Sequence, residues 1–223
     1  MSLIEDASLK DKRWVFADRK KAGAVLARML EGRVSDSGII MAIPSGGMPV
    51  ARVIADTLGM EMGVVVVRRI QIPWNTETGF GAVGPNGEPV FNSQLLARLR
   101  LSEEDILRQR ERAMRSVRQR EKMFLKGRPY PSVKGREVVL VDDGLATGYT
   151  MLAAVRFTKG RGARTVSVAV PTASVNAIEL LEDTVDHIYC ANLRTGSAFA
   201  VADAYDHWTD ISEWEVERML DAR

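Results

Sequence analysis

Five short runs of aliphatic and β-branched residues are spaced along the chain, at 39–43, 64–67, 138–141, 165–170 and 185–190. In three of these runs, at 39–43, 64–67 and 138–141, the residues are apolar at successive positions instead of alternate ones, which is typical of parallel strands buried on both faces. Helices are expected among them, at 16–30, 50–58, 151–159 and 174–181, and the first has the spacing of an amphipathic helix. This alternation predicts an α/β fold, a doubly wound and mostly parallel sheet with flanking helices.

The segment 71–92 breaks this pattern because it is rich in glycine, proline and asparagine. Within it, residues 80–83 and 88–91 are expected to pair as a hairpin across Gly84–Gly87. A loop of this length without strong structure in a compact domain usually serves a function or is disordered.

Composition sets the scale of the molecule. The chain has 223 residues, and the 46% that are hydrophobic suffice for one good core. We predict a single domain over residues 1–223, with its core at about 38–190 and a charged, loosely held stretch at 1–13. The single cysteine, Cys190, leaves no partner for a disulfide within the chain and fits a cytoplasmic location. Neither a signal peptide nor a membrane span is expected, and a net charge of +2 does not by itself indicate a nucleic-acid or membrane partner.

The strand predicted at 138–141 ends in two adjacent acids, Asp142 and Asp143, and a loop then leads into the next helix. Glycines in this loop let backbone amides converge, and the helix N-terminus adds unsatisfied donors and partial positive charge. The hydroxyls of Thr147 and Thr150 are further donors. Such a loop suits a phosphate group.

Two carboxylates beside a phosphate site are unfavourable unless they face something else. Sugar hydroxyls and a hydrated divalent cation are the natural candidates. A phosphate, a diol and Mg²⁺ at one short loop together describe a ribose 5-phosphate group.

Residues 141–150, Val-Asp-Asp-Gly-Leu-Ala-Thr-Gly-Tyr-Thr, resemble the phosphoribosyl pyrophosphate (PRPP) signature of type I phosphoribosyltransferases. The resemblance implies a Mg²⁺-dependent transferase of nucleotide metabolism that displaces pyrophosphate from PRPP with a nitrogen nucleophile, a nucleobase or related heterocycle. It also implies a homodimer. Asp142 and Asp143 would be catalytic, holding the ribose hydroxyls or the metal through water, with no direct protein ligand to the metal assigned. The residues implied to bind the 5-phosphate are Gly144, Leu145, Ala146, Thr147, Gly148 and Thr150.

A second strand, loop and helix unit follows the run at 39–43, in the sequence Pro44-Ser45-Gly46-Gly47-Met48-Pro49. Taken alone, a Gly-Gly turn after a strand is a common connection. The resemblance implies that Ser45, Gly46 and Gly47 bind pyrophosphate, largely through main-chain N–H groups. We expect the two glycines to adopt backbone conformations closed to other residues.

Arg68 and Arg69 follow the run at 64–67, at the strand end where open α/β sheets bind ligands. The resemblance implies a basic catalytic residue here that contacts pyrophosphate. Because successive side chains of a strand point opposite ways, only one of the two is expected to reach the site.

The resemblance also implies two covers for the site. Segment 71–92 would be a flexible loop that closes over it and excludes water, and residues 191–223 would form a small C-terminal hood over the base. Packing of the tail is the alternative role for the hood aromatics. Those expected to stack on the base are Phe199, Tyr205 and Trp208.

The acceptor is left open by the sequence. Relatives that act on 6-oxopurines carry an acid three residues after the second Asp, and here that position is Ala146. Hypoxanthine and guanine are therefore disfavoured. With Phe16-Ala-Asp-Arg19 upstream, the whole pattern is similar to a branch of predicted phosphoribosyltransferases whose acceptor is unassigned.

A long helix is predicted from a cap at Ser102 to about Lys126, and residues 108–126 hold eight basic residues against two acids. A solvated face, or one that meets an acidic partner surface, is the favoured interpretation. The alternative is a PRPP-sensing regulator that binds nucleic acid through this helix. A different α/β enzyme for phosphosugars is a third hypothesis.

Overall fold

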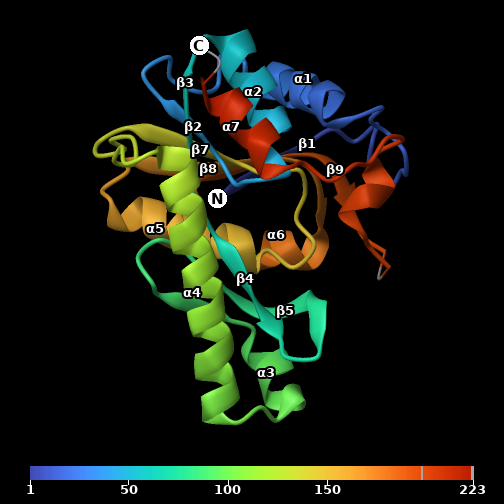
Figure 1. Ribbon diagram of the computed structural model, residues 1–223. Coiled ribbons are helices and arrows are strands. Elements are labelled where there is room, and N and C mark those ends of the chain that lie inside the picture. The colour runs from blue at the N-terminus through green and yellow to red at the C-terminus, as the bar shows by residue number, and fades with distance from the viewer. Residues whose placement is uncertain (197, 222–223) are drawn as a thin grey trace.

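The computed structural model of the chain describes residues 1–196 and 198–221, apart from the side chains of Thr76 and Glu77 (Figure 1). Its centre is a parallel sheet of six strands in the order β1-β9-β8-β7-β2-β3. The predicted α/β class and parallel sheet are thereby confirmed. The strands are β1 (Ser2–Glu5), β2 (Ile39–Ala42), β3 (Glu61–Val64), β7 (Glu137–Val141), β8 (Thr165–Ser174) and β9 (His187–Arg194).

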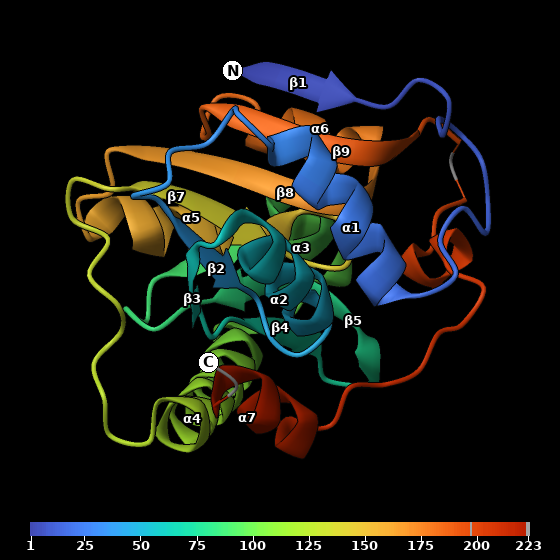
Figure 2. The same ribbon diagram turned by 90° about the horizontal axis from the view of Figure 1, so that it is seen from above.

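Helices cover both faces of this sheet (Figure 2). Helices α1 (Arg19–Leu30) and α2 (Gly47–Leu58) share one core with Val139 and Val141 of β7. Helices α5 (Tyr149–Gly160) and α6 (Val175–Leu181) share the other with Val138 and Leu140. Because neighbouring residues of β7 enter different cores, the strand must be apolar at successive positions.

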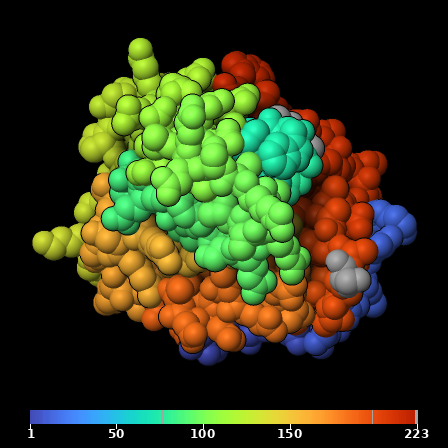
Figure 3. All heavy atoms as spheres, turned by 90° about the horizontal axis from the view of Figure 1, so that it is seen from below, coloured from blue at the N-terminus to red at the C-terminus, as the bar shows by residue number. Residues whose placement is uncertain are grey.

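A smaller antiparallel sheet lies to one side, in the order β4-β5-β6. Its strands are β4 (Arg68–Ile72), β5 (Asn75–Val83) and β6 (Pro89–Phe91). The hairpin expected between 80–83 and 88–91 is confirmed by pairs such as Gly81 with Phe91 and Val83 with Pro89. Figure 3 shows the β4–β5 turn (teal) at the surface next to α4 (green).

Helix α4 (Glu103–Leu125) runs along β4, and α3 (Ser93–Leu99) precedes it (Figure 1). The predicted cap is confirmed, because the Ser102 side chain accepts a hydrogen bond from the Asp105 amide. After a 3₁₀ helix at Val201–Ala204, the chain ends in α7 (Glu213–Asp221), which packs against α2 and α4. Glu213 forms an ion pair with Arg120 of α4, with 3.1 Å between Oε1 and Nε.

Two expectations for the core were wrong. The stretch 1–13 is not loosely held throughout, because β1 pairs with β9 and extends the sheet. The run 64–67 is not the third strand, which ends at Val64. Val65, Val66 and Val67 are instead a buried connection between the two sheets. The Val65 amide still donates to the Ala42 carbonyl of β2 at 2.9 Å, whereas Val66 and Val67 lie outside any strand.

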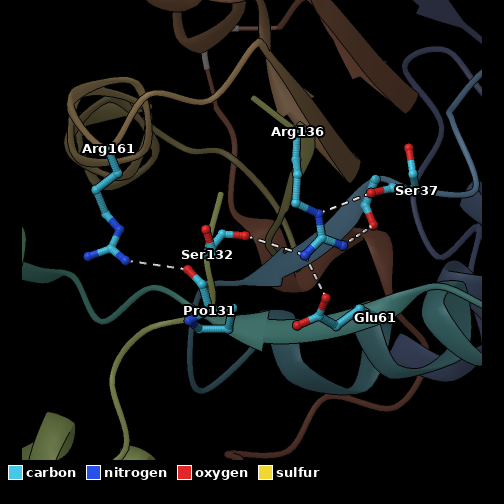
Figure 4. A network of polar contacts seen from close by, with 7 residues as sticks. Ser37, Glu61, Pro131, Ser132, Arg136 and Arg161 are labelled. Carbon is cyan, nitrogen blue, oxygen red and sulfur yellow. Dashed lines mark hydrogen bonds and ion pairs between the residues drawn. The ribbon is translucent and has the colours of Figure 1, made fainter. Parts of the chain in front are cut away.

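The amino ends of the central strands are joined by Arg136 (Figure 4). Its guanidinium donates to the Ser37, Gly38 and Ser132 carbonyls, at 3.0, 2.8 and 3.3 Å, and to Glu61 Oε2 at 2.6 Å. These acceptors flank β2, β3 and β7, so one side chain ties three neighbouring strands together.

None of the helices within the described residues is both long enough and apolar enough to cross a membrane.

Candidate active site

Two loops meet at the carboxyl edge of the sheet, where the strand order reverses. Strands β2 and β7 are neighbours, with Ala42 opposite Val141. From β2 the chain proceeds to β3 on one side, whereas β7, β8 and β9 build the other. Open α/β sheets bind ligands at such a switch point. The structure therefore brings together the loop at 44–47 and the loop at 142–150, as their positions in the sequence predicted.

The loop after β7 is held at one end and left open along the rest. The Leu145 amide donates to the Thr172 carbonyl at 2.9 Å, and the Ala146 carbonyl accepts from Ser174 Oγ at 2.7 Å. Within the described part of the chain, the amides of Ala146, Thr147 and Gly148 donate to no protein acceptor. Together with the first turn of α5 they form a set of unsatisfied donors that suits an anion.

Two glycines of this loop have separate structural reasons. Gly148 has a φ of +79°, a left-handed conformation that places it as the N-cap of α5. A Cβ on Gly144 would lie 2.5 Å from the Val201 side chain, so a larger residue would push away the 3₁₀ helix of the C-terminal segment.

The glycines of the other loop act through close approach, and the expectation of unusual backbone conformations was wrong for both. Gly47 is the first residue of α2, and the N-cap before it is Gly46. The φ of Gly46 is −61°, which is open to any residue. A Cβ there, however, would lie 1.9 Å from Asp143 Oδ2, and a Cβ on Gly47 would lie 2.6 Å from the Val141 carbonyl. The glycines thus allow the two loops to touch.

Some amides of this loop donate hydrogen bonds within the protein, and others have no protein acceptor. The Gly47 amide donates to the Ile43 carbonyl at 3.1 Å and the Met48 amide to the Ser45 carbonyl at 3.1 Å. No acceptor among the described residues takes the amides of Ser45 and Gly46, both of which are half-buried. The Pro44–Ser45 peptide bond is cis.

The two acids lie between these loops. Burial raises the pKa of Asp142 well above its ordinary value, and the neighbouring charge of Asp143 raises it further. Burial also raises the pKa of Asp143, although Arg19 opposes the shift. Arg19 Nε donates to Asp143 Oδ2 at 2.8 Å, and the Asp143 amide donates to Asp142 Oδ1 at 2.9 Å. Arg19 therefore compensates the negative charge of the two carboxylates only in part.

Arg19 joins the acidic couple to the C-terminal segment. Its side chain is 8% exposed, and its Nη1 donates to the Thr209 carbonyl at 2.7 Å. Its guanidinium carbon lies 3.8 Å from the centre of the Trp208 ring, a cation–π contact. Arg19 also lines a cavity of about 570 Å³ between α1, α2 and α7, but the residues of the two loops at 44–47 and 142–150 do not line it.

Sequence reasoning gave Arg19 no role, although a signal was present. Arg19, Lys20 and Lys21 occupy the first turn of α1, which contains no acid. Positive charge at a helix N-terminus opposes the helix dipole, so a cation placed there and then buried indicates a specific partner.

The hood aromatics differ in what they offer a ligand. Tyr205 is 2% exposed, its ring packs near Phe16, and its hydroxyl donates to the Asp143 carbonyl at 2.6 Å. It thus anchors the acidic loop. Trp208 is 38% exposed and lies beside Arg19, whereas the Phe199 ring lies 5.9 Å from the Arg194 guanidinium.

Arg68 and Arg69 lie at the start of β4 and not at the end of a parallel strand. Burial lowers the pKa of Arg68 to about 10, together with the charges of Arg120 on α4 and of the neighbouring Arg69, whereas Glu213 on α7 raises it. Both arginines line a second cavity with residues of α4. Their predicted contact with pyrophosphate stays a prediction.

The acidic couple fits a magnesium ion that is shared with a substrate. Mg²⁺ uses carboxylate oxygens but keeps several waters and is usually held by one or two carboxylates plus substrate phosphates. Asp142 and Asp143 supply two such groups at one loop. Within the described residues there is no cluster of three or more His, Cys, Asp or Glu that could hold a metal ion.

Comparison with known proteins gives a consistent result. The model of the family described as "Phosphoribosyl transferase domain" matches residues 17–192. Two Mycobacterium tuberculosis proteins (strains CDC 1551 and H37Rv), provisionally named phosphoribosyl transferases, are 32% identical over 208 residues. That alignment covers 93% of this chain but only 46% of theirs, so the chain spans about half the length of these curated relatives.

Solved structures resemble the fold. The protein TT1426 from Thermus thermophilus superposes with a TM-score of 0.74 at 35% identity, covering 92% of this chain and 97% of that one. The protein AQ2163 from Aquifex aeolicus has a TM-score of 0.52 at 14% identity, covering 92% and 83%, which indicates a shared fold only.

Proposed function

The chain belongs to the phosphoribosyl transferase domain family, and from this premise we propose that it is a Mg²⁺-dependent phosphoribosyltransferase that displaces pyrophosphate from C1 of PRPP with a nitrogen nucleophile. The observation that carries the proposal is the contact of two amide-bearing loops around a buried acidic couple. Such a site matches PRPP, because the phosphates of PRPP bind hydrogen-bond donors such as the loop amides, whereas its ribose hydroxyls donate to acceptors such as the two carboxylates.

The loop at 144–150 would bind the 5-phosphate. We assign the direct contacts to the amides of Ala146, Thr147 and Gly148 and to the hydroxyls of Thr147 and Thr150. Leu145 would hold the loop in place instead, because its amide donates a hydrogen bond to the Thr172 carbonyl. Gly144 would serve by allowing the C-terminal segment to approach.

The loop at 44–47 would bind the departing pyrophosphate through the amides of Ser45 and Gly46. Gly47 would contribute indirectly, because its amide is used by Ile43 and its lack of a side chain admits the acidic loop. When bound, Mg²⁺ would supply positive charge to the pyrophosphate, and the acidic couple is the protein group suited to hold its water shell.

The acidic couple would act on the sugar. Breaking the C1–oxygen bond before the nucleophile is fully bonded gives the ribose oxocarbenium character. Asp142 and Asp143 would accept from the ribose hydroxyls, hold the ring in place and favour its developing positive charge. No protein nucleophile is required, since the nitrogen acceptor itself forms the new bond to C1.

The acceptor would be a nucleobase or related heterocycle held under the C-terminal segment. Of the three predicted aromatics, we favour Trp208 for stacking, because it keeps exposed surface next to Arg19 while Tyr205 is covered. Ala146 offers no acid to a 6-oxopurine ring. The homodimer, the cytoplasmic location and closure of segment 71–92 stay predictions of the resemblance.

The test is release of pyrophosphate from PRPP and Mg²⁺ by the purified chain, with a panel of purine and pyrimidine bases and a no-base control. We expect at least one base to accelerate release, and the Asp143→Asn protein to lose that acceleration. PRPP binding without release for any base would contradict a transferase. Equal competition by ribose 5-phosphate would favour a different phosphosugar-binding protein.

No structural observation favours the nucleic-acid alternative for α4. Five of the eight basic residues at 108–126 already form ion pairs or hydrogen bonds within the chain. These five are Arg108, Arg110, Arg115, Arg120 and Lys126.

A further inference from the structure

The side chain of Arg19 reaches from the first turn of α1 to two other parts of the site. Its Nε donates to Asp143 Oδ2 at 2.8 Å, and its Nη1 donates to the Thr209 carbonyl at 2.7 Å. The guanidinium carbon also lies 3.8 Å from the centre of the Trp208 ring. Because a guanidinium is planar and its N–H groups point in fixed directions, these contacts hold the acidic loop and the C-terminal segment in one relative orientation.

Main-chain hydrogen bonds attach the C-terminal segment to the residues before α1, and they stop just before Trp208. The last of them along the chain runs from the His207 amide to the Ala17 carbonyl, at 2.9 Å. In the part of the chain that the structure describes, residues 208–211 form no hydrogen bond from main chain to main chain. Arg19 therefore continues the attachment of this segment to the start of α1, beside which it lies (Figure 2).

The requirement for an arginine at this position comes from outside α1. The helix is already capped by Asp18, whose side chain accepts from the Lys21 amide at 2.8 Å. A cation in the first turn opposes the helix dipole, and burying it adds a further cost unless it is paired. Arg19 is buried there nonetheless, so its contacts with the acidic loop and the C-terminal segment explain the residue.

The same contacts fix the direction of the Asp143 carboxylate. The oxygen that accepts from Arg19, Oδ2, lies against the loop at 44–47, where a Cβ on Gly46 would be 1.9 Å from it. The Tyr205 hydroxyl holds the main chain of the same residue, because it donates to the Asp143 carbonyl at 2.6 Å. The Tyr205 ring centre is in turn 5.2 Å from that of Trp208. The acid and the indole are therefore connected twice, through Arg19 and through Tyr205.

We propose that Arg19 is a positioning residue that couples the two halves of the active site: it orients Asp143 toward the ribose and holds Trp208 in place for the acceptor. The inference rests on the proposed transferase function, in which Asp143 accepts from ribose hydroxyls and Trp208 stacks on a base. Arg19 would contact neither substrate, because its Nε and Nη1 donate to protein oxygens. The acceptor would lie on the face of the indole that the guanidinium leaves free, since Trp208 is 38% exposed.

The variant Arg19→Lys distinguishes positioning from charge alone. It keeps a cation for Asp143, but an ammonium is a point charge without a planar fork, so it cannot reproduce all three contacts at once. Arg19→Gln removes the cation as well. The matched control is Lys20→Gln, which removes one charge from the same turn of α1 at an exposed position. Trp208→Leu removes the ring and leaves Arg19 in place.

The first measurement needs no acceptor. Acrylamide quenching of tryptophan fluorescence is recorded for each protein with and without Trp208→Leu, so that the difference reports this indole among the four tryptophans. We expect Arg19→Lys to raise the quenching constant of Trp208 about twofold or more, because the covering guanidinium is lost, while Lys20→Gln leaves it unchanged. Unchanged quenching in Arg19→Lys would overturn the proposal, whether or not the chain is a transferase.

The second measurement is steady-state kinetics with the base that gives the fastest pyrophosphate release. We expect Arg19→Lys to raise KM for this base about tenfold while KM for PRPP stays within about threefold, whereas Arg19→Gln should raise both. Added to Trp208→Leu, Arg19→Lys should raise KM for the base no further, because it acts through that ring.

Additive losses in the double variant, or recovery of both KM values in Arg19→Lys, would overturn the proposal. Arg19→Lys carries this decision because it keeps a partner for the buried acid that Arg19→Gln leaves unpaired. Failure of the transferase proposal gives a different result, since no base would then accelerate release by the wild-type chain. The quenching of Trp208 would in that case decide the role of Arg19 by itself.

Discussion

The polar groups at the two edges of the central sheet differ in whether they have hydrogen-bond partners within the protein. At the amino edge, the guanidinium of Arg136 makes four hydrogen bonds, to three carbonyls and to Glu61 (Figure 4). At the carboxyl edge, the loops after β2 and β7 leave amides without protein acceptors, and burial raises the pKa of both Asp142 and Asp143.

The difference separates stability from function. A satisfied network lowers the free energy of the folded state and offers nothing to a ligand. Unsatisfied donors and buried acids lower the stability of the folded protein, but they are available to bind a ligand with phosphates and hydroxyls. Substitutions at the carboxyl edge should therefore lower activity more than stability, and substitutions at the amino edge should lower stability more than activity.

The largest expected effect is that of Asp142→Asn on turnover. Asparagine keeps an oxygen for the Asp143 amide but removes the charge that favours a cationic ribose, so we expect turnover with the best base to fall about a hundredfold or more. The free energy of unfolding should not fall, because a buried charge beside Asp143 is gone. Steady-state kinetics and urea unfolding check both, with the exposed Asp36→Asn as control. Unchanged turnover would remove the acidic couple from the mechanism.

At the other edge, Arg136→Ala should do the reverse. It leaves the Ser37, Gly38 and Ser132 carbonyls and the Glu61 carboxylate without this donor, and we expect the free energy of unfolding to drop by about 2–3 kcal/mol. KM for PRPP should stay unchanged. Arg161→Ala is the matched control, since its two carbonyl contacts are both 3.4 Å long and should contribute less. A large increase in KM for Arg136→Ala would contradict the prediction that the amino edge contributes to stability and not to PRPP binding.

Much of the carboxyl edge could be predicted because its signals are local. The two-sided burial of β7 is visible in four successive apolar residues, and the acids and glycines follow directly in the chain. Helix ends at Asp18 and Ser102 were likewise readable from their capping side chains.

What the sequence concealed depends on tertiary contact. Val65–Val67 has the composition of a strand but connects two sheets, because burial and strand pairing select the same side chains. Arg19 reaches Asp143 across 124 positions of sequence. Gly46 is glycine because of Asp143, not because of its own φ, and no local pattern reports that contact.

That contact can be tested with a single methyl group. Gly46→Ala would place a Cβ 1.9 Å from Asp143 Oδ2, so the carboxylate must shift away from its position at Arg19. We expect KM for PRPP to rise about tenfold and the free energy of unfolding to fall by about 1 kcal/mol. Gly160→Ala is the control, because its Cβ meets nothing within 4 Å and should stabilise the end of α5 by up to about 1 kcal/mol. Equal behaviour of the two variants would mean that the loops are not in functional contact.

The most gradual effect is the dependence of stability on pH. Because the pKa of Asp142 is raised in the folded protein, the folded state binds its proton more tightly than the unfolded chain does. The unfolding free energy contributed by this group therefore falls as pH rises from the ordinary aspartate value of 3.8 through the raised value. Asp142→Asn lacks this contribution, so its stability relative to wild type should increase with pH over that interval and then level off.

Urea unfolding of both proteins at a series of pH values measures the relation, and Gly160→Ala, which alters no charge, should keep a constant difference from wild type throughout. A flat difference for Asp142→Asn as well would mean that the buried acid costs the fold nothing. The carboxyl edge would then be as well satisfied as the amino edge, and the reason for expecting a charged sugar ligand there would be lost.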